Sequence, residues 1–339
     1  MRQISSMLQG LARSMAGKER KGEEEQGTVL RTSGTLRGEG SETFAAAYSR
    51  RGEKGTNQDC SIVWEGFGCQ EDSIFCGIFD GHGQWGHYVA KAVRDSLPPS
   101  LLCRRQEAVA LASLIDGEKK LSDCQFDLWK QSYLAAAATV DEELRRNRRL
   151  DAVDSGSTAL SIVKQGEMMV IANVGDSRAV LATTSDDGKV AAVQLTVDFK
   201  PNLPQEHERI RQCKGRVFAL GDEPGVHRVW LPDQEAPGLA MSRAFGDYCV
   251  KDYGVISTPE VTQRRITPRD QFVILATDGV WDVISNQEAV QIVAATPDRE
   301  KAAKRLVQCA VREWRRKRPC YAVDDCSAIC LFFHSPPPS

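Results

Sequence analysis

One stretch decides how the chain is interpreted: Ile74-Phe75-Cys76-Gly77-Ile78-Phe79-Asp80-Gly81-His82-Gly83-Gln84-Trp85-Gly86. Its first half is a short apolar run, which predicts a buried strand. A carboxylate at the end of a buried strand is costly unless it is paired, and glycines let the backbone bring a carbonyl close to a ligand. Asp80 with such a carbonyl suits Mg²⁺ or Mn²⁺, although Asp-Gly is also a common turn dipeptide.

The composition is that of an ordinary globular protein. The chain has 339 residues, 41% of them hydrophobic and 27% charged, which is enough for a sizeable core. The net charge of −2 argues against a general nucleic-acid binder, and no apolar run approaches the roughly 18 residues of a membrane span. Eleven cysteines without a C-x-x-C pair predict free thiols. We therefore expect a chain without a transmembrane segment, located in the cytoplasm, the nucleus or both.

The two ends of the chain predict tails. Residues 1–43 carry a charge run and a glycine-rich stretch, so we expect a disordered tail there. Apolar residues at helical spacing with basic neighbours in residues 1–18 leave an alternative open, an organelle-targeting segment or a membrane-surface helix. Residues 334–339 are rich in proline and predict a second disordered tail, which leaves residues 44–333 as the globular domain.

Within that domain, helices and strands follow from periodicity and turn residues. A short helix marked by Val89, Val93 and Leu97 is predicted to stop at Pro98-Pro99, with residues 98–122 as a loop or insertion. Four strand-like runs between residues 159 and 195 predict antiparallel hairpins. Residues 216–240 contain three prolines and little periodicity, which predicts a long surface loop.

The arrangement at Asp80 recurs elsewhere in the chain. The apolar run 272–277 leads directly into Asp278-Gly279, Asp324 precedes the last apolar strand, and Asp59 lies at the start of another. Four carboxylates converging at one rim of a β-sandwich would repel one another without cations. An oxygen-only cluster, with no Cys or His ligand set, indicates a site for two Mg²⁺ or Mn²⁺ ions.

Seven segments in order give the chain its resemblance to a family. They are Lys54 to Asp59, Phe79 to Gly83, Ser155 to Ala159, Val174 to Ala179, Leu239 to Asp247, Ala276 to Asp282 and Asp324 to Ser327. The chain resembles protein phosphatase 2C, the metal-dependent serine/threonine phosphatases, and most closely the plant members. The resemblance covers about residues 44–333 and implies one phosphatase catalytic domain. It implies an α+β fold, a central antiparallel β-sandwich of two sheets flanked by helices on both outer faces.

The resemblance also assigns roles to residues. It implies two Mg²⁺ or Mn²⁺ ions held by four carboxylates and one backbone carbonyl, with Asp80 bridging the ions: Asp59, Asp80, Gly81, Asp278 and Asp324. His82 matches the general acid, and Lys54 falls where many relatives carry a phosphate-binding Arg. Lys can neutralise a phosphate only as a point charge, without the bidentate fork of Arg. Asp176 and Asp282 match positions that the family can use for a weaker third metal, although Gly-Asp-Ser at Asp176 also suits a hairpin turn.

The implied reaction is hydrolysis of phosphoserine and phosphothreonine in proteins, by a water activated between the two metals. His82 would protonate the leaving alkoxide. The expected partners are phosphorylated protein substrates, with no nucleic acid, and the chain is expected to be a monomer. Two alternatives stay open: a pseudophosphatase acting as a binding module, and another carboxylate-metal hydrolase such as a nuclease. Trp230 is similar to the hormone-receptor-docking Trp of one plant subgroup, but its different neighbours favour an exposed packing residue.

Overall fold

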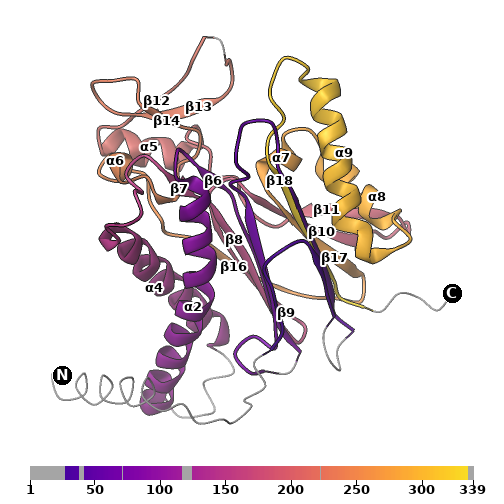
Figure 1. Cartoon of the computed structure of the whole chain (residues 1–339). Helices are drawn as coiled ribbons and strands as arrows, with labels where there is room; N and C mark the ends of the chain where they lie inside the picture. Colours follow the sequence, from indigo (N-terminus) through magenta and orange to yellow (C-terminus); the bar gives the residue numbers. More distant parts are fainter. Residues whose placement is uncertain (1–26, 38–41, 71, 117–123, 222, 335–339) are drawn as a thin grey trace.

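Two six-stranded antiparallel sheets packed face to face form the centre of the computed structural model (Figure 1). The structure describes residues 27–37, 42–70, 72–116, 124–221 and 223–334, so the predictions for residues 1–26 and for most of the C-terminal tail lie outside the described residues. The first sheet has the order β1 (Val29–Leu30), β4 (Cys60–Glu65), β5 (Ser73–Phe79), β8 (Ala159–Gln165), β9 (Met168–Val174), β16 (Glu260–Arg265). The second has the order β11 (Val190–Gln194), β10 (Arg178–Thr184), β17 (Asp270–Ala276), β18 (Cys326–Phe332), β3 (Phe44–Arg50), β2 (Gly34–Arg37).

The space between the sheets is filled by alternate side chains of both. Ile78 of β5, Leu160 of β8, Leu275 of β17 and Ile329 of β18 are all fully buried in this central cluster. Successive side chains of a strand point to opposite faces, so the same strands also supply an outer apolar face to each sheet. Those two outer faces have to be covered by helices, and this requirement produces the four-layered sandwich that the sequence resemblance implied.

The outer face of the first sheet is covered by two helices, α2 (Gly86–Asp116) and α4 (Gln125–Arg146). The prediction that a helix stops at Pro98-Pro99 is wrong, because α2 continues through both prolines. An interior proline costs a helix about 3 kcal/mol, but the buried face formed by Val89, Val93, Leu97 and Leu101 runs on through this point. Burial against the sheet and α4 offsets the lost helical hydrogen bonds.

The outer face of the second sheet is covered by α8 (Asn286–Ala294) and α9 (Ala302–Lys317). Helix α8 begins with a capping box, in which the Glu288 backbone N–H donates to Ser285 Oγ at 3.3 Å. Two further helices, α5 (Pro204–Gln212) and α6 (Tyr248–Lys251), lie beside the sandwich. Within the described residues, every helix is too short or too polar to span a lipid bilayer.

Two small sheets lie at one end of the sandwich (Figure 1). The predicted surface loop 216–240 is instead a three-stranded sheet of β12 (Arg216–Ala219), β13 (His227–Trp230) and β14 (Pro237–Leu239). Trp230 is only 5% exposed, because its ring stacks on Phe218 with centroids 5.1 Å apart and its Nε1 donates to the Phe218 carbonyl. Trp230 therefore packs inside this sheet, and the expectation that it is exposed is wrong.

The other small sheet consists of three two-residue strands, β6 (Gly81–His82), β7 (Gly156–Ser157) and β15 (Phe245–Gly246). It joins the end of β5 to two segments that are distant in the chain. Strands β1 and β2 also extend the edges of the two large sheets, although the sequence analysis included them in a disordered tail. Leu36 of β2 is 5% exposed and belongs to the central cluster, so the ordered domain begins before Phe44.

Candidate active site

The four predicted metal carboxylates all lie where strands of the sandwich begin or end. Asp80 follows β5, Asp59 precedes β4, Asp324 lies just before β18, and Asp278 opens the short helix α7 (Asp278–Trp281) directly after β17. Figure 1 shows β6 and α7 at the same end of the molecule. Each of these aspartates lies at the end of an apolar strand, where the backbone turns out of the core. A carboxylate is tolerated at this point because it is not enclosed by apolar side chains on every side.

The electrostatics of these carboxylates are those of one cluster. Burial raises the pKa of Asp80 well above its usual value, and the charges of Asp59 and Asp278 raise it further. Burial also raises the pKa of Asp59 to about 7, although Thr277 Oγ1 donates a hydrogen bond to its Oδ2 at 3.0 Å. The pKa of Asp278 is raised by burial and by the charges of Asp176 and Asp324. Each carboxylate therefore disfavours ionisation of the others.

The donor atoms of this cluster fit hard divalent cations. All of them are oxygens, the ligands that Mg²⁺ and Mn²⁺ prefer. Asp59 Oδ1 and Asp176 Oδ1 are buried without a hydrogen-bond partner among the described residues. A buried oxygen without a partner is costly, and a bound cation would remove that cost.

The carboxylates of the cluster do not converge on one ion position. In the described ranges, no three His, Cys, Asp or Glu side chains are arranged so that they could hold an ion as they stand. Lysines take up part of the negative charge instead: Lys54 Nζ donates to Asp324 Oδ2 at 2.6 Å, and Lys200 Nζ pairs with Asp176 Oδ2. Burial opposes the charged form of Lys54, but the carboxylate of Asp324 outweighs it and raises the pKa of this lysine.

A cavity of about 320 Å³ lies in front of the cluster. Four of the predicted site residues line it, namely Lys54, Asp80, Gly81 and Asp324. Asp59, Asp278 and His82 do not line this cavity. The predicted site is therefore gathered at one end of the sandwich, with some members facing the cavity and others behind or beside it.

Asp325 is a structural member of the site that the sequence analysis did not single out. Its carboxylate accepts the backbone N–H groups of Gly52 at 2.7 Å and Gln58 at 2.8 Å. Gln58 in turn donates its side-chain amide to the Gly83 carbonyl at 2.7 Å and accepts the Gly81 N–H at its own carbonyl at 3.2 Å. Asp325 therefore fixes the loop that carries Lys54 against the turn after Asp80.

His82 is held by Asp247, to which no role was assigned from the sequence. Its Nε2 lies 2.7 Å from Oδ2 of Asp247, whose side chain is 3% exposed. Burial opposes the charged form of His82, but the charge and hydrogen bond of Asp247 outweigh it and raise the pKa of the imidazole. A Cβ at Gly156 would lie 2.1 Å from Asp247 Oδ2 and 2.6 Å from His82 Nε2. Only glycine at this position leaves room for the pair.

Asp247 is the last residue of Leu239 to Asp247, one of the seven segments that carry the resemblance. In the structure, Asp247 follows the buried Phe245 and Gly246 and adopts the left-handed conformation with φ of 53°. A non-glycine residue in that conformation is uncommon and often marks a functional constraint. Nothing in the sequence, however, connected it to a histidine 165 positions away.

The fold is shared with solved structures of other proteins. The crystal structure of serine-threonine phosphatase 2C from Toxoplasma gondii superposes with a TM-score of 0.80 at 24% identity, covering 91% of this chain and 99% of that chain. A structure of a C. elegans sex determining protein gives a TM-score of 0.67 at 21% identity, covering 86% of this chain and 65% of that chain. At such identities the likeness establishes the architecture alone, a sandwich between two helical layers.

The family follows from the sequence comparisons. Residues 47–317 match the family described as protein phosphatase 2C, and the chain belongs to this family. It is 75% identical to "Probable protein phosphatase 2C 48" of Oryza sativa subsp. japonica, over 99% of this chain and 100% of that protein. It is 59% identical to "Probable protein phosphatase 2C 73" of Arabidopsis thaliana, over 99% of this chain and 95% of that protein. The chain is thus a plant-type member, and its family supports serine/threonine protein dephosphorylation and metal dependence.

Proposed function

We propose that this protein hydrolyses phosphoserine and phosphothreonine in phosphorylated protein substrates, using two Mg²⁺ or Mn²⁺ ions. Asp59, Asp80, Asp278, Asp324 and the carbonyl of Gly81 would hold the ions. The observation that carries the proposal is the set of buried and half-buried carboxylates that raise one another's pKa values beside an open cavity. Bound cations would lower the pKa of a water and offset the charge of the phosphoryl oxygens.

The chain's own residues would bind the substrate and move the proton. Lys54, on the rim of the cavity, would turn from Asp324 toward a substrate phosphate as a point charge. His82 would protonate the leaving alkoxide. Its Nε2 is occupied by Asp247, whereas its Nδ1 is buried without a partner among the described residues, so Nδ1 is the nitrogen from which a proton can leave.

The alternatives have less support. A pseudophosphatase would not need its metal carboxylates or its general acid, yet all four aspartates and His82 are present. A nuclease would favour a basic surface, and this chain has a net charge of −2. The proposal therefore includes no nucleic-acid partner, a monomeric enzyme, and action in the cytoplasm or nucleus, in keeping with free cysteines throughout the described residues.

Phosphate release is the test of this function. With Mn²⁺ present, we expect the protein to dephosphorylate a phosphothreonine peptide and to leave a short DNA duplex intact. Asp80→Asn and Asp278→Asn should each lower kcat by at least about a hundredfold. Asp233→Asn, at an exposed loop position, is the matched control and should keep full turnover. Full activity of metal-stripped enzyme in excess EDTA would contradict the proposal.

A further inference from the structure

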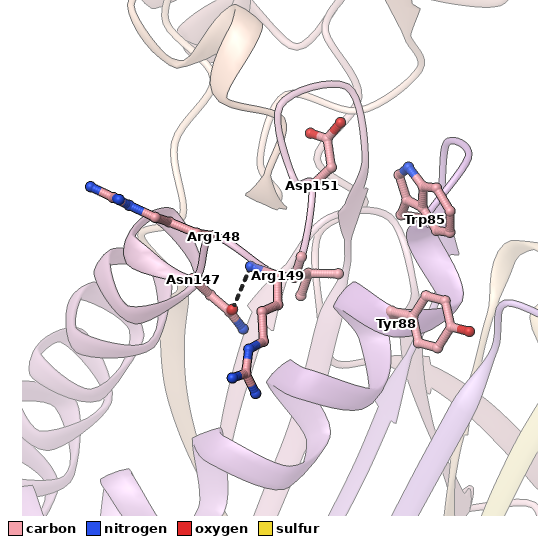
Figure 2. Close-up of a pocket in the computed structure, with 7 residues that line it drawn as sticks. Trp85, Tyr88, Asn147, Arg148, Arg149 and Asp151 are labelled. Atoms are coloured by element: carbon pink, nitrogen blue, oxygen red, sulfur yellow. Dashed lines mark hydrogen bonds between the residues drawn. The ribbon is translucent and has the colours of Figure 1, made fainter.

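A groove runs beside the candidate active site, between the start of α2 and the segment that follows α4. Trp85 and Tyr88 form one wall, and residues 147–151 form the other (Figure 2). It encloses about 910 Å³, nearly three times the volume of the cavity in front of the carboxylates. A groove of this size is large enough for several residues of an extended peptide.

The aromatic wall is unusually exposed. Trp85 is 39% exposed and Tyr88 is 51% exposed, and their rings stack with centroids 6.0 Å apart. Tyr and Trp are enriched at recognition surfaces because they offer a large apolar contact area together with a polar group. A stacked pair that is left open to solvent in a groove therefore indicates a binding surface.

The opposite wall is basic. Arg148 and Arg149 are both exposed, and within the described part of the chain neither guanidinium takes part in an ion pair or a hydrogen bond. Figure 2 shows Arg149 extending down the groove and Arg148 pointing outward over α4. One carboxylate, Asp151, also lies on this wall, and its Oδ1 accepts the Val153 N–H at 3.0 Å. Asp151 keeps its negative charge, so the two arginines leave this wall with an excess of one positive charge for a ligand.

Both walls are fixed to the elements that hold His82. The Trp85 N–H donates to Ser155 Oγ at 3.0 Å, and the Ser155 carbonyl accepts the Asp247 N–H at 3.0 Å. Gly83 packs against the segment that follows the second wall, because a Cβ at this position would be 2.3 Å from the Asp154 carbonyl. A peptide in the groove would consequently sit at a defined position relative to a phosphoresidue at the catalytic cavity.

We propose that this groove binds the segment of the phosphoprotein substrate that flanks the phosphoserine or phosphothreonine, and that it selects acidic flanks. Glu or Asp side chains of the substrate pair with Arg149 in the groove and with Arg148 at its outer edge, and an apolar substrate side chain lies on the rings of Trp85 and Tyr88. This inference rests on the proposed function, because it names the substrate class of the same site. The charge of the wall is what commits the occupant to an acidic segment.

The test compares two phosphothreonine peptides that differ only in three flanking positions, Glu in one and Gln in the other. We expect kcat/KM of the wild type to be about tenfold higher for the Glu peptide at low salt, and this ratio to fall as NaCl screens the charges. The double variant Arg148→Glu/Arg149→Glu should abolish the ratio, and Arg148→Gln/Arg149→Gln should reduce it. Each rate is divided by the rate of the same variant on p-nitrophenyl phosphate, so that any loss of folded enzyme cancels.

The matched control is Arg305→Glu/Arg312→Glu on α9, two exposed arginines without ion pairs among the described residues, on the opposite side of the sandwich (Figure 1). It changes the net charge equally and should keep the wild-type preference. Equal kcat/KM of the wild type for the two peptides, or a preference that survives Arg148→Glu/Arg149→Glu, would overturn the inference. Binding to anionic vesicles that needs these arginines, with equal peptide rates, would also overturn it.

Failure of the proposed function is a separate outcome. If the wild type releases no phosphate from either peptide or from p-nitrophenyl phosphate, the proposed function is contradicted. The groove is then judged by fluorescence anisotropy of the labelled peptides. A dissociation constant about tenfold lower for the Glu peptide, lost in Arg148→Glu/Arg149→Glu, would support an acidic-peptide groove, and equal dissociation constants would overturn it.

Discussion

At the scale of single residues, the candidate site depends on how His82 is held. Asp247 fixes one nitrogen of the imidazole, raises its pKa and reaches it only because Gly156 has no side chain. A raised pKa favours the protonated imidazole, which is the form that can donate a proton to a poor leaving group. The same geometry would also suit a histidine that merely orders the turn after Asp80, so the two roles need a test that separates them.

His82→Ala should slow natural substrates far more than activated ones. Phosphoserine and phosphothreonine leave as strongly basic alkoxides, and general acid catalysis typically contributes about 10² to 10⁴-fold. A nitrophenyl phosphate leaves as a stabilised phenolate and needs little protonation. We therefore expect kcat at saturating Mn²⁺ to fall by about 10² or more for a phosphopeptide and far less for p-nitrophenyl phosphate. Equal losses on both substrates would mean that His82 is not the acid.

Asp247→Asn should shift the pH profile without removing the acid. The charge of Asp247 raises the pKa of His82 against the effect of burial, so its removal lowers that pKa. The protonated form is then lost at lower pH, and the alkaline decline of kcat for a phosphopeptide should move to lower pH. We expect no such movement with p-nitrophenyl phosphate, nor in Asp252→Asn, an exposed carboxylate at the end of α6. An unchanged profile in Asp247→Asn would contradict this role.

The metal-ligand candidates could be found from sequence, because each is a local pattern of an apolar strand followed or preceded by Asp. Asp247 and Asp325 could not be found in this way, because their partners lie 165 and more than 260 positions away. A single sequence carries no record of such pairings. The role of a residue can therefore be predicted when it depends on neighbours in the sequence. It cannot be predicted when it depends on a partner from a distant element.

At the scale of elements, the errors came from tertiary packing that overrides local signals. Pro98-Pro99 is a strong local stop, but the apolar face of α2 continues past it and is buried. Residues 216–240 form a sheet because Trp230 and Phe218 stack across short, irregular strands that have no clear alternation. In both cases the decisive contacts are with side chains that the local pattern does not show.

The small sheet of β12, β13 and β14 is connected to the body near a buried ion cluster. Glu206 of α5 is 2% exposed and accepts hydrogen bonds from Arg209, Arg243 and Ser242. Burial opposes ionisation of Glu206, but these hydrogen bonds outweigh it and lower the pKa to about 2. Helix α5 precedes β12 and Arg243 follows β14, so this cluster holds both ends of the small sheet.

Glu206→Gln should destabilise the fold by about 3 kcal/mol at pH 7, because it leaves Arg209 and Arg243, both partly buried, without their carboxylate. A carboxylate whose pKa is lowered on folding contributes stability above its unfolded pKa of about 4.5, and that stability is lost as the pH falls toward about 2. The difference in unfolding free energy from wild type, measured in urea, should therefore shrink between pH 5 and pH 3. Glu235→Gln, at an exposed position between β13 and β14, is the control and should change little. A pH-independent difference would contradict this account.

At the scale of the whole molecule, the four-layered order was implied by the resemblance and is confirmed by the structure and its solved relatives. Two of the antiparallel hairpins predicted within residues 159–195, β8 with β9 and β10 with β11, are confirmed. The pairing predicted across residues 175–177 is wrong, because β9 and β10 belong to different sheets and this turn crosses from one sheet to the other. The edge strands β1 and β2 were not readable, because their few apolar residues lie among charged and glycine-rich neighbours. They are ordered by the sheets that they extend, which is a property of the complete fold.

The carboxylate cluster sets a further property of the whole fold, its dependence on pH and on divalent cations. The pKa values of these carboxylates are raised on folding, so they stabilise the folded state at a pH below their unfolded pKa of about 4. This contribution is lost as the pH rises through the folded pKa, which is about 7 for Asp59. The melting temperature of metal-stripped protein should therefore fall between pH 5 and pH 8. Mn²⁺ should raise it, more at pH 8 than at pH 5, because ligands must be deprotonated to bind.

The variant Asp80→Asn separates the effect of Mn²⁺ on the melting temperature from the effect of repulsion among the carboxylates. It removes the carboxylate that interacts with Asp59, Asp278 and Asp324, so the metal-stripped variant should melt higher than wild type at pH 8. For the wild type, Mn²⁺ at a hundredfold excess over its dissociation constant adds about 2.7 kcal/mol, a rise of roughly 5 °C. Asp80→Asn should show a much smaller rise, and Asp233→Asn should behave as wild type in both respects. Calorimetry of each protein at pH 5 and pH 8, with and without Mn²⁺, measures these melting temperatures. An equal rise with Mn²⁺ in Asp80→Asn and in the wild type would exclude Asp80 from the metal site.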